Sequence, residues 1–81
     1  MKFLLTSRAL RDYERLSLAL QKSVDKQLAL LVKNPRHPSL RAKKYDEMRG
    51  IWQARVSRSY RLYFVIKNGI YKIITIISHP K

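Results

Sequence analysis

Residues 51–79 contain three short runs rich in β-branched and aromatic side chains, separated by two turn signals. The stronger signal is Asn68-Gly69, because both residues suit the positive φ angles of a type I′ turn, whose twist matches its flanking strands. The weaker one is Ser57-Arg58-Ser59. Runs of this kind joined by short turns predict a three-stranded antiparallel meander.

A two-residue turn also fixes how the last two strands pair. Lys67 is expected opposite Ile70, and strict alternation then places Arg61 opposite Ile76. One face of the meander then carries Arg61, Tyr63, Val65 and Lys67. The opposite face is nearly continuous apolar surface and is the expected core: Tyr60, Leu62, Phe64, Ile66, Tyr71, Ile73, Thr75 and Ile77.

The first strand of the meander brings two arginines together. Pairing of Val56 with Tyr60 puts Trp52, Ala54 and Val56 in the core and turns Gln53 and Arg55 to the other face. Arg55 then lies directly across from Arg61, and like charges in this position destabilise a sheet. Because no Asp or Glu follows Met48, we expect an anionic ligand to neutralise this face.

Length and charge limit the possible classes of protein. Eighty-one residues make one domain, expected to span 1–81, and the chain has no cysteine for disulfide bonds or thiolate metal sites. No run is long enough for a membrane span or an export signal, so a cytoplasmic protein is expected. The net charge of +13 favours nucleic acid, or an acidic protein, as the partner.

The N-terminal half predicts a strand and two helices. Lys2 to Thr6 is a short apolar run, and Ser7 is expected to cap a helix that ends near Leu16. A second helix is expected from about Leu18 to Lys33, where Asn34-Pro35 ends it. The expected core stripes are Ala9, Leu10, Tyr13 and Leu16 on the first helix, and Leu20, Val24, Leu28, Leu30, Leu31 and Val32 on the second. The predicted fold is therefore α+β, in the order β-α-α-β-β-β, with a helical hairpin packed on one sheet face.

A basic loop, residues 35–50, precedes the meander. It contains two prolines and ends in Gly50, with a short extended piece expected at Leu40 to Lys44. This piece carries Arg41, Lys43 and Lys44 next to the strand that holds Arg55. Asp46 and Glu47 fit a solvated turn paired with Lys43, Lys44 or Arg49 better than they fit general bases.

Several strings resemble the RelE/ParE superfamily of bacterial toxins from type II toxin-antitoxin pairs. They are His37-Pro38-Ser39-Leu40-Arg41-Ala42-Lys43-Lys44, Ile51-Trp52-Gln53-Ala54-Arg55-Val56, Tyr60-Arg61-Leu62-Tyr63-Phe64 and the closing His79-Pro80-Lys81. The resemblance covers nearly the whole chain. It implies a toxin neutralised by a cognate acidic antitoxin. In the RelE branch such a toxin is an endoribonuclease (an mRNA interferase) that cuts messenger RNA at the ribosome without metal or cofactor and so inhibits translation. In the ParE branch it inhibits DNA gyrase.

The resemblance also implies roles for individual residues. Arg61 is similar to the arginine that RelE-type enzymes place on the scissile phosphate, and Arg55 falls where many members have a basic residue. His79 falls where several members carry a histidine or arginine implicated in proton transfer. Two positions depart from the pattern: Gln53 stands where RelE-like enzymes can carry a lysine, and the tyrosine that often follows the terminal basic residue has no counterpart up to Lys81.

The chemistry gives the same residues consistent roles. Metal-free RNA cleavage uses the 2′-hydroxyl as nucleophile, so the protein must orient it, move protons and stabilise charge. Arg55 and Arg61 suit the stabilisation of charge, Lys43 or Lys44 assists, and His79 is the candidate general acid or base. Strict alternation, however, puts His79 on the face opposite Arg61 unless the strand twists near Ser78. The expected RNA-binding residues are Arg41, Arg49, Arg58, Tyr63, Lys72 and Lys81.

The aromatic residues and the histidines have simpler interpretations. Trp52 is expected to be a packing anchor, whereas Tyr63 can stack on a nucleotide beside Arg61. Two histidines without clustered acids predict no metal site. Three functions stay open from sequence: a toxin ribonuclease acting on messenger RNA, a gyrase-directed inhibitor of the same fold, and a non-enzymatic basic binding module.

Overall fold

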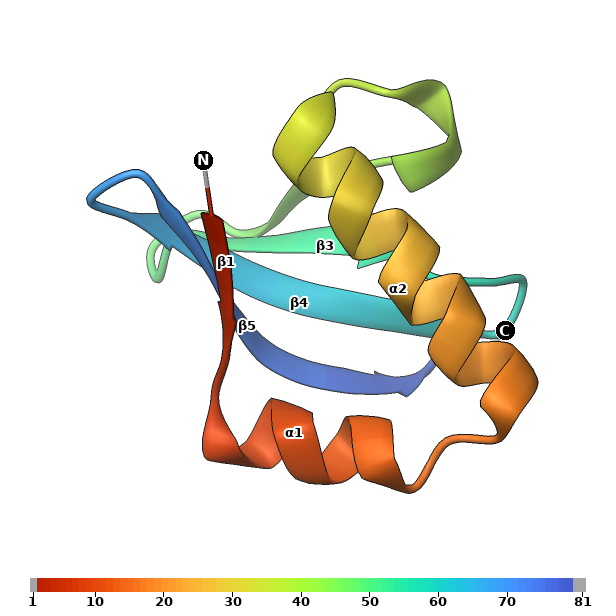
Figure 1. Cartoon of the computed structure of the whole chain (residues 1–81). Helices are drawn as coiled ribbons and strands as arrows, with labels where there is room; N and C mark the ends of the chain where they lie inside the picture. The colour runs from red at the N-terminus through yellow and green to blue at the C-terminus, as the bar shows by residue number, and fades with distance from the viewer. Residues whose placement is uncertain (1, 80–81) are drawn as a thin grey trace.

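The chain folds in the order β1 (Lys2–Leu5), α1 (Ser7–Glu14), α2 (Leu18–Lys33), the 3₁₀ helix η1 (Pro38–Leu40), β2 (Lys43–Asp46), β3 (Ile51–Arg55), β4 (Tyr60–Lys67) and β5 (Ile70–Ser78). This computed structural model describes residues 2–79. The five strands form one sheet in the order β1-β5-β4-β3-β2 (Figure 1). The parallel pairing of β1 with β5 makes the sheet mixed, and the other pairs are antiparallel. The predicted α+β class and meander are confirmed.

The helices lie against the sheet in a V, with α2 crossing one face and α1 running along β5 (Figure 1). Thr6, not Ser7 as predicted, caps α1, because its hydroxyl accepts the backbone N–H of Ala9 at 3.2 Å. Ser17 caps α2 by accepting the N–H of Leu20. α1 is also shorter than predicted and ends at Glu14.

The core lies between α2, α1 and the sheet, as predicted. Its buried members are Ala9, Val24, Leu28, Leu31, Leu40, Ala54, Val56, Leu62, Phe64, Tyr71, Ile73 and Ile76. Three predicted core residues are exposed instead: Leu10 and Ile66 are each 46% exposed, and Ile77 is 38% exposed. Leu10 lies on the two-turn helix α1, of which only Ala9 is fully buried, and Ile66 lies where β4 nears its turn.

The predicted pairing of β4 with β5 holds only as far as a β-bulge. Lys67 pairs with Ile70 and Val65 with Lys72, as expected, but Phe64 pairs with Ile73 and Tyr63 with Thr75. Ile74 is therefore an extra residue, and every later residue of β5 changes face relative to the prediction. Arg61 consequently lies opposite Ile77 rather than Ile76. Ile76 enters the core, in place of Thr75 and Ile77.

Polar side chains from the N-terminal half hold this bulge. The Thr6 hydroxyl donates to the carbonyl of Ile74 at 3.0 Å. The Asp12 carboxylate accepts from the Thr75 hydroxyl at 2.6 Å and from the backbone N–H of Ile76 at 3.0 Å. Because these contacts satisfy the groups that the irregular pairing leaves free, the bulge is a fixed feature of the sheet.

Candidate functional site

The two arginines singled out in the sequence lie directly opposite one another. Arg55 on β3 pairs with Arg61 on β4, and Arg61 pairs in turn with Ile77 on β5. We call Arg55 and Arg61 the arginine pair, and the sheet face that carries them, turned away from α2, the outer face. Within residues 2–79 the one ion pair is between Arg49 and Asp46, so neither arginine of the pair has a carboxylate partner there.

Hydrogen bonds fix the side chain of Arg61 and the main chain of Arg55. Nη1 of Arg61 donates to the carbonyls of Ser57 at 2.7 Å and Tyr60 at 2.9 Å, which anchors the guanidinium to the β3–β4 turn. The carbonyl of Arg55 accepts from Nε2 of Gln27, which is buried beneath the sheet, at 2.8 Å. A guanidinium held through one nitrogen keeps its remaining donors for an anion.

His79 follows β5 at the same end of the sheet. Its backbone N–H donates to the carbonyl of Ser59 at 2.6 Å, so the chain stays paired beyond Ser78. Since the bulge places Ile77 opposite Arg61, alternation brings His79 to the outer face as well. Strict alternation without the bulge would have put His79 on the face opposite Arg61, and the bulge removes this conflict.

Lys43 and Lys44 lie on opposite faces. Lys43 pairs with Gln53, whose side chain contacts Tyr63 on the outer face. Lys44 pairs with Trp52 and places its Nζ 4.7 Å from the centre of the indole ring, a cation–π contact on the helix side. The structure therefore brings Lys43, and not Lys44, to the face of the arginine pair.

Two tyrosines lie beside the arginine pair. Tyr45, the extra residue of a second bulge in β2, packs edge to face on Tyr63 with 4.8 Å between ring centres and 71° between ring planes. The Tyr63 hydroxyl donates to Oε1 of Gln53 at 3.2 Å. Burial and then Tyr45 raise the pKa of Tyr63, whereas the charge of Arg61 lowers it, so Arg61 acts on this hydroxyl electrostatically.

The other predicted RNA-binding residues are scattered. Arg58 is exposed in the β3–β4 turn, at the end of the sheet near the arginine pair, and Lys72 pairs with Val65 farther along the outer face. Asp46 engages Arg49 through an ion pair at 3.7 Å and a backbone hydrogen bond at 3.2 Å, which confirms the local turn pairing expected for this acid. Arg41 lies on the helix side, and Lys81 is outside the described residues.

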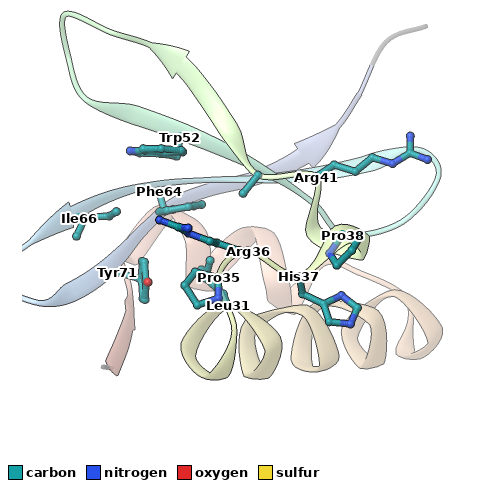
Figure 2. A pocket seen from close by; sticks show the side chains of 11 residues that line it. Leu31, Pro35, Arg36, His37, Pro38, Arg41, Trp52, Phe64, Ile66 and Tyr71 are labelled. Atoms are coloured by element: carbon teal, nitrogen blue, oxygen red, sulfur yellow. The ribbon is translucent and has the colours of Figure 1, made fainter.

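A second feature, on the helix side, is an apolar groove of about 460 Å³ between the end of α2 and the sheet. In Figure 2 the Trp52 ring lies over Phe64, with Ile66 and Tyr71 beside them. Arg36, His37 and Arg41 also line the groove, and none of its lining residues is acidic. The groove therefore offers apolar contact and positive charge on the face opposite the arginine pair.

Residues 3–81 match the family model described as the ParE toxin of type II toxin-antitoxin systems, parDE. The chain belongs to this toxin family. Comparison with the sequences of curated proteins gives no match. The match to the family model confirms the RelE/ParE superfamily resemblance seen in the sequence.

Solved structures give this ParE-family toxin the same fold as RelE and YoeB proteins. A YoeB/ParE toxin from Agrobacterium tumefaciens superposes with a TM-score of 0.82 at 16% identity, covering 99% of this chain and 100% of the other. The RelBE2 toxin-antitoxin complex from Mycobacterium tuberculosis gives 0.77 at 22% identity, covering 96% of each chain. The intact E. coli RelBE toxin-antitoxin complex gives 0.75 at 18% identity, covering 98% and 96%.

Within residues 2–79 the toxin carries neither a cluster of metal ligands nor a helix that could span a membrane. No three His, Cys, Asp or Glu side chains gather where a metal ion would fit. Neither α1 nor α2 has the length and hydropathy of a membrane-spanning helix.

Sequence reasoning missed three residues that shape the outer face of the toxin. Asp12 holds the β5 bulge, Gln27 holds the Arg55 carbonyl, and Tyr45 packs on Tyr63. A polar residue within an apolar helix stripe, as Gln27 is, was the one available signal. Asp12 and Tyr45 act through bulges, which residue spacing does not reveal.

Proposed function

We propose that this toxin is a metal-independent endoribonuclease that cleaves messenger RNA, with the ribosome presenting the strand. The observation that carries the proposal is the arginine pair, two guanidiniums on directly opposed residues of the outer face without a carboxylate partner among residues 2–79. Like charges so placed destabilise an empty sheet and stabilise a bound phosphate.

The reaction needs little more than these groups. The 2′-oxygen of the RNA attacks the adjacent phosphorus, the bond to the 5′-oxygen breaks, and a cyclic phosphate and a free 5′-hydroxyl result. Arg55 and Arg61 stabilise the charge that develops on the non-bridging oxygens, and Lys43 adds a further positive charge. His79 transfers a proton between the attacking or leaving oxygen and solvent.

Arg55 and His79 are the residues on which to test this function, because Arg61 also anchors the β3–β4 turn. Purified toxin is incubated with ribosomes and messenger RNA, and the cleavage ends are mapped. Arg55→Ala is expected to lower the cleavage rate by about 100-fold or more, and His79→Ala by a similar factor. Met48→Ala, at a side chain 98% exposed, is the control. Full cleavage by the Arg55 and His79 variants would refute the proposal.

A second candidate function is inhibition of DNA gyrase, as the ParE branch of the superfamily implies. The match to the ParE family model and Gln53, at a position where RelE-like enzymes can carry lysine, favour it. A supercoiling assay with purified gyrase separates the two functions. Gyrase inhibition that His79→Ala leaves intact, together with no RNA cleavage, would select the inhibitor.

We also propose a cognate acidic antitoxin as the partner. Three observations support it: the net charge of +13, the basic lining of the apolar groove, and the toxin-antitoxin complexes among the similar structures. An amphipathic acidic segment would place apolar side chains on Trp52 and Ile66 and carboxylates near Arg36. If the proposal holds, the gene beside that of the toxin encodes a small acidic protein, and co-expression with it is expected to give a stable complex, which Ile66→Asp weakens.

A further inference from the structure

The aromatic pair on the outer face stands close to the arginine pair. Tyr63 lies two residues along β4 from Arg61, and its partner on β3, Gln53, lies two residues from Arg55. Two residues along a strand span about 7 Å, so the Gln53–Tyr63 pair lies next to the arginine pair on the same face. A phosphate on the arginine pair would therefore hold an adjoining base over the tyrosines.

The two rings are held in different ways. Tyr63 is half-buried and fixed by its hydrogen bond to Gln53, which is itself only 7% exposed. Tyr45 is 62% exposed, and its described aromatic contact is with Tyr63. The bulge in β2 leaves Tyr45 unpaired in the sheet, and bulges of this kind re-aim side chains beside active sites. The arrangement gives one fixed ring supporting one ring open to a ligand.

The surroundings favour a nucleobase as that ligand. An exposed aromatic ring beside guanidinium groups combines stacking area with phosphate binding, as single-strand binding surfaces do. Lys43 adds positive charge in the same row, and Asp46, the nearest acid in the sequence, is occupied by Arg49. These surroundings therefore suit an anionic strand with planar bases.

We propose that Tyr45 and Tyr63 form a stacking platform for one base of the RNA strand whose phosphate lies on Arg55 and Arg61, and that Gln53 positions Tyr63 beneath it. This inference rests on the proposed function, because it names where the strand lies. It assigns Tyr45, which no sequence motif indicates, to substrate binding.

Salt dependence separates stacking from charge. A fluorescent RNA oligonucleotide with 2′-O-methyl groups, which cannot be cleaved, is titrated with the full-length toxin at several salt concentrations. Tyr45→Ala is expected to weaken binding by about 5- to 100-fold at every salt concentration and leave the salt slope unchanged. Tyr45→Phe is expected to bind as the wild type does. Arg55→Ala is expected to reduce the slope instead.

An abasic nucleotide identifies the stacked base. Bases of the oligonucleotide are removed one at a time. At one position, removal of the base is expected to weaken binding by the wild type, and Tyr45→Ala is then expected to cause no further loss of affinity. Such coupling measures contact between ring and base, which a merely structural role of Tyr45 would not produce. Gln53→Leu is expected to reduce the coupling in part.

The remaining outcomes are distinguishable. If the wild-type toxin binds the oligonucleotide neither free in solution nor presented by ribosomes, the proposed function fails and the platform fails with it. If the wild type binds RNA and Tyr45→Ala binds equally well, the platform alone is overturned. If Tyr45→Ala weakens only the complex with the antitoxin, the rings are a protein interface and the platform is likewise overturned.

Discussion

Arg55 lies opposite Arg61 on the adjacent strand, and hydrogen bonds accepted by backbone carbonyls hold the main chain of the one and the side chain of the other. Gln27 fixes the main chain at Arg55 from below, and the Ser57 and Tyr60 carbonyls hold the Arg61 side chain. Two like charges on directly opposed residues are thus built into the folded state, and such charges repel one another. A site that binds an anion gains affinity from such repulsion when the ligand relieves it.

Removing one charge of the arginine pair should therefore stabilise the toxin. Arg55→Gln is expected to raise the free energy of unfolding by about 0.5 kcal/mol at low ionic strength, because like charges directly opposite cost roughly 0.2–1 kcal/mol. Urea denaturation measures this difference, and added salt should shrink it by screening. A lower stability of Arg55→Gln at low salt would contradict the argument. Arg61→Gln is unsuitable here because it also removes two hydrogen bonds.

Lys43 and Lys44 give a test in which net charge is matched. Lys43→Ala is expected to weaken RNA binding and reduce the salt slope by about 0.7, the value for one phosphate contact on a single strand. Lys44→Ala removes the same charge from the other face and should leave the slope unchanged. Its effect should appear in the fluorescence of Trp52 and as a loss of about 0.5–1 kcal/mol of stability. Equal slopes for both variants would show that only bulk charge matters.

The sequence anticipated the parts of this fold that depend on local chemistry. Asn68-Gly69 specified the β4–β5 turn, and both residues have the positive φ that the turn requires. The pairing of Arg55 with Arg61 was also predictable, because it follows from the short β3–β4 turn and from strict alternation along the two strands. Fold class and the arginine pair were therefore accessible from residue types and spacing alone.

What the sequence did not reveal depends on contacts between distant segments. The β5 bulge is held by Thr6 and Asp12, more than sixty residues away in the chain, so alternation alone gave Ile77 and His79 the wrong face. Which sheet face Lys43 and Lys44 each occupy likewise depends on the register of β2 against β3. One extra residue reverses every later side chain of a strand, so a pattern that is correct locally fails beyond it.

The bulge gives a prediction about Asp12. Asp12→Ala removes the acceptor for the Thr75 hydroxyl and the Ile76 N–H, and is expected to lower the free energy of unfolding by about 2–3 kcal/mol. RNA cleavage should fall too, because the bulge aligns His79 with the outer face. Asp25→Ala is the matched control: it changes the net charge equally but removes a hydrogen bond to Tyr13 only. Similar losses for both variants would disprove the role of the bulge.

Alkaline pH gives a test of the contact between Tyr63 and Arg61. The pKa of Tyr63 is raised chiefly by burial and further by Tyr45, whereas Arg61 lowers it. A raised pKa in the folded state contributes stability that is complete below the ordinary tyrosine pKa and is lost as pH rises through the folded value. The toxin should therefore lose stability faster above about pH 10 than its Tyr63→Phe variant does.

The titration of Tyr63 can be followed by the residue-resolved NMR signals of isotope-labelled tyrosine rings in a Tyr13→Phe background, because the hydrogen bond to Asp25 also raises the pKa of Tyr13. In that background Arg61→Gln is expected to raise the pKa of Tyr63 further, since a cation that stabilises the tyrosinate is removed. Tyr45→Phe is expected to lower it. A pKa of Tyr63 that does not respond to Arg61→Gln would place the guanidinium out of reach of the hydroxyl and would separate the tyrosines from the arginine pair.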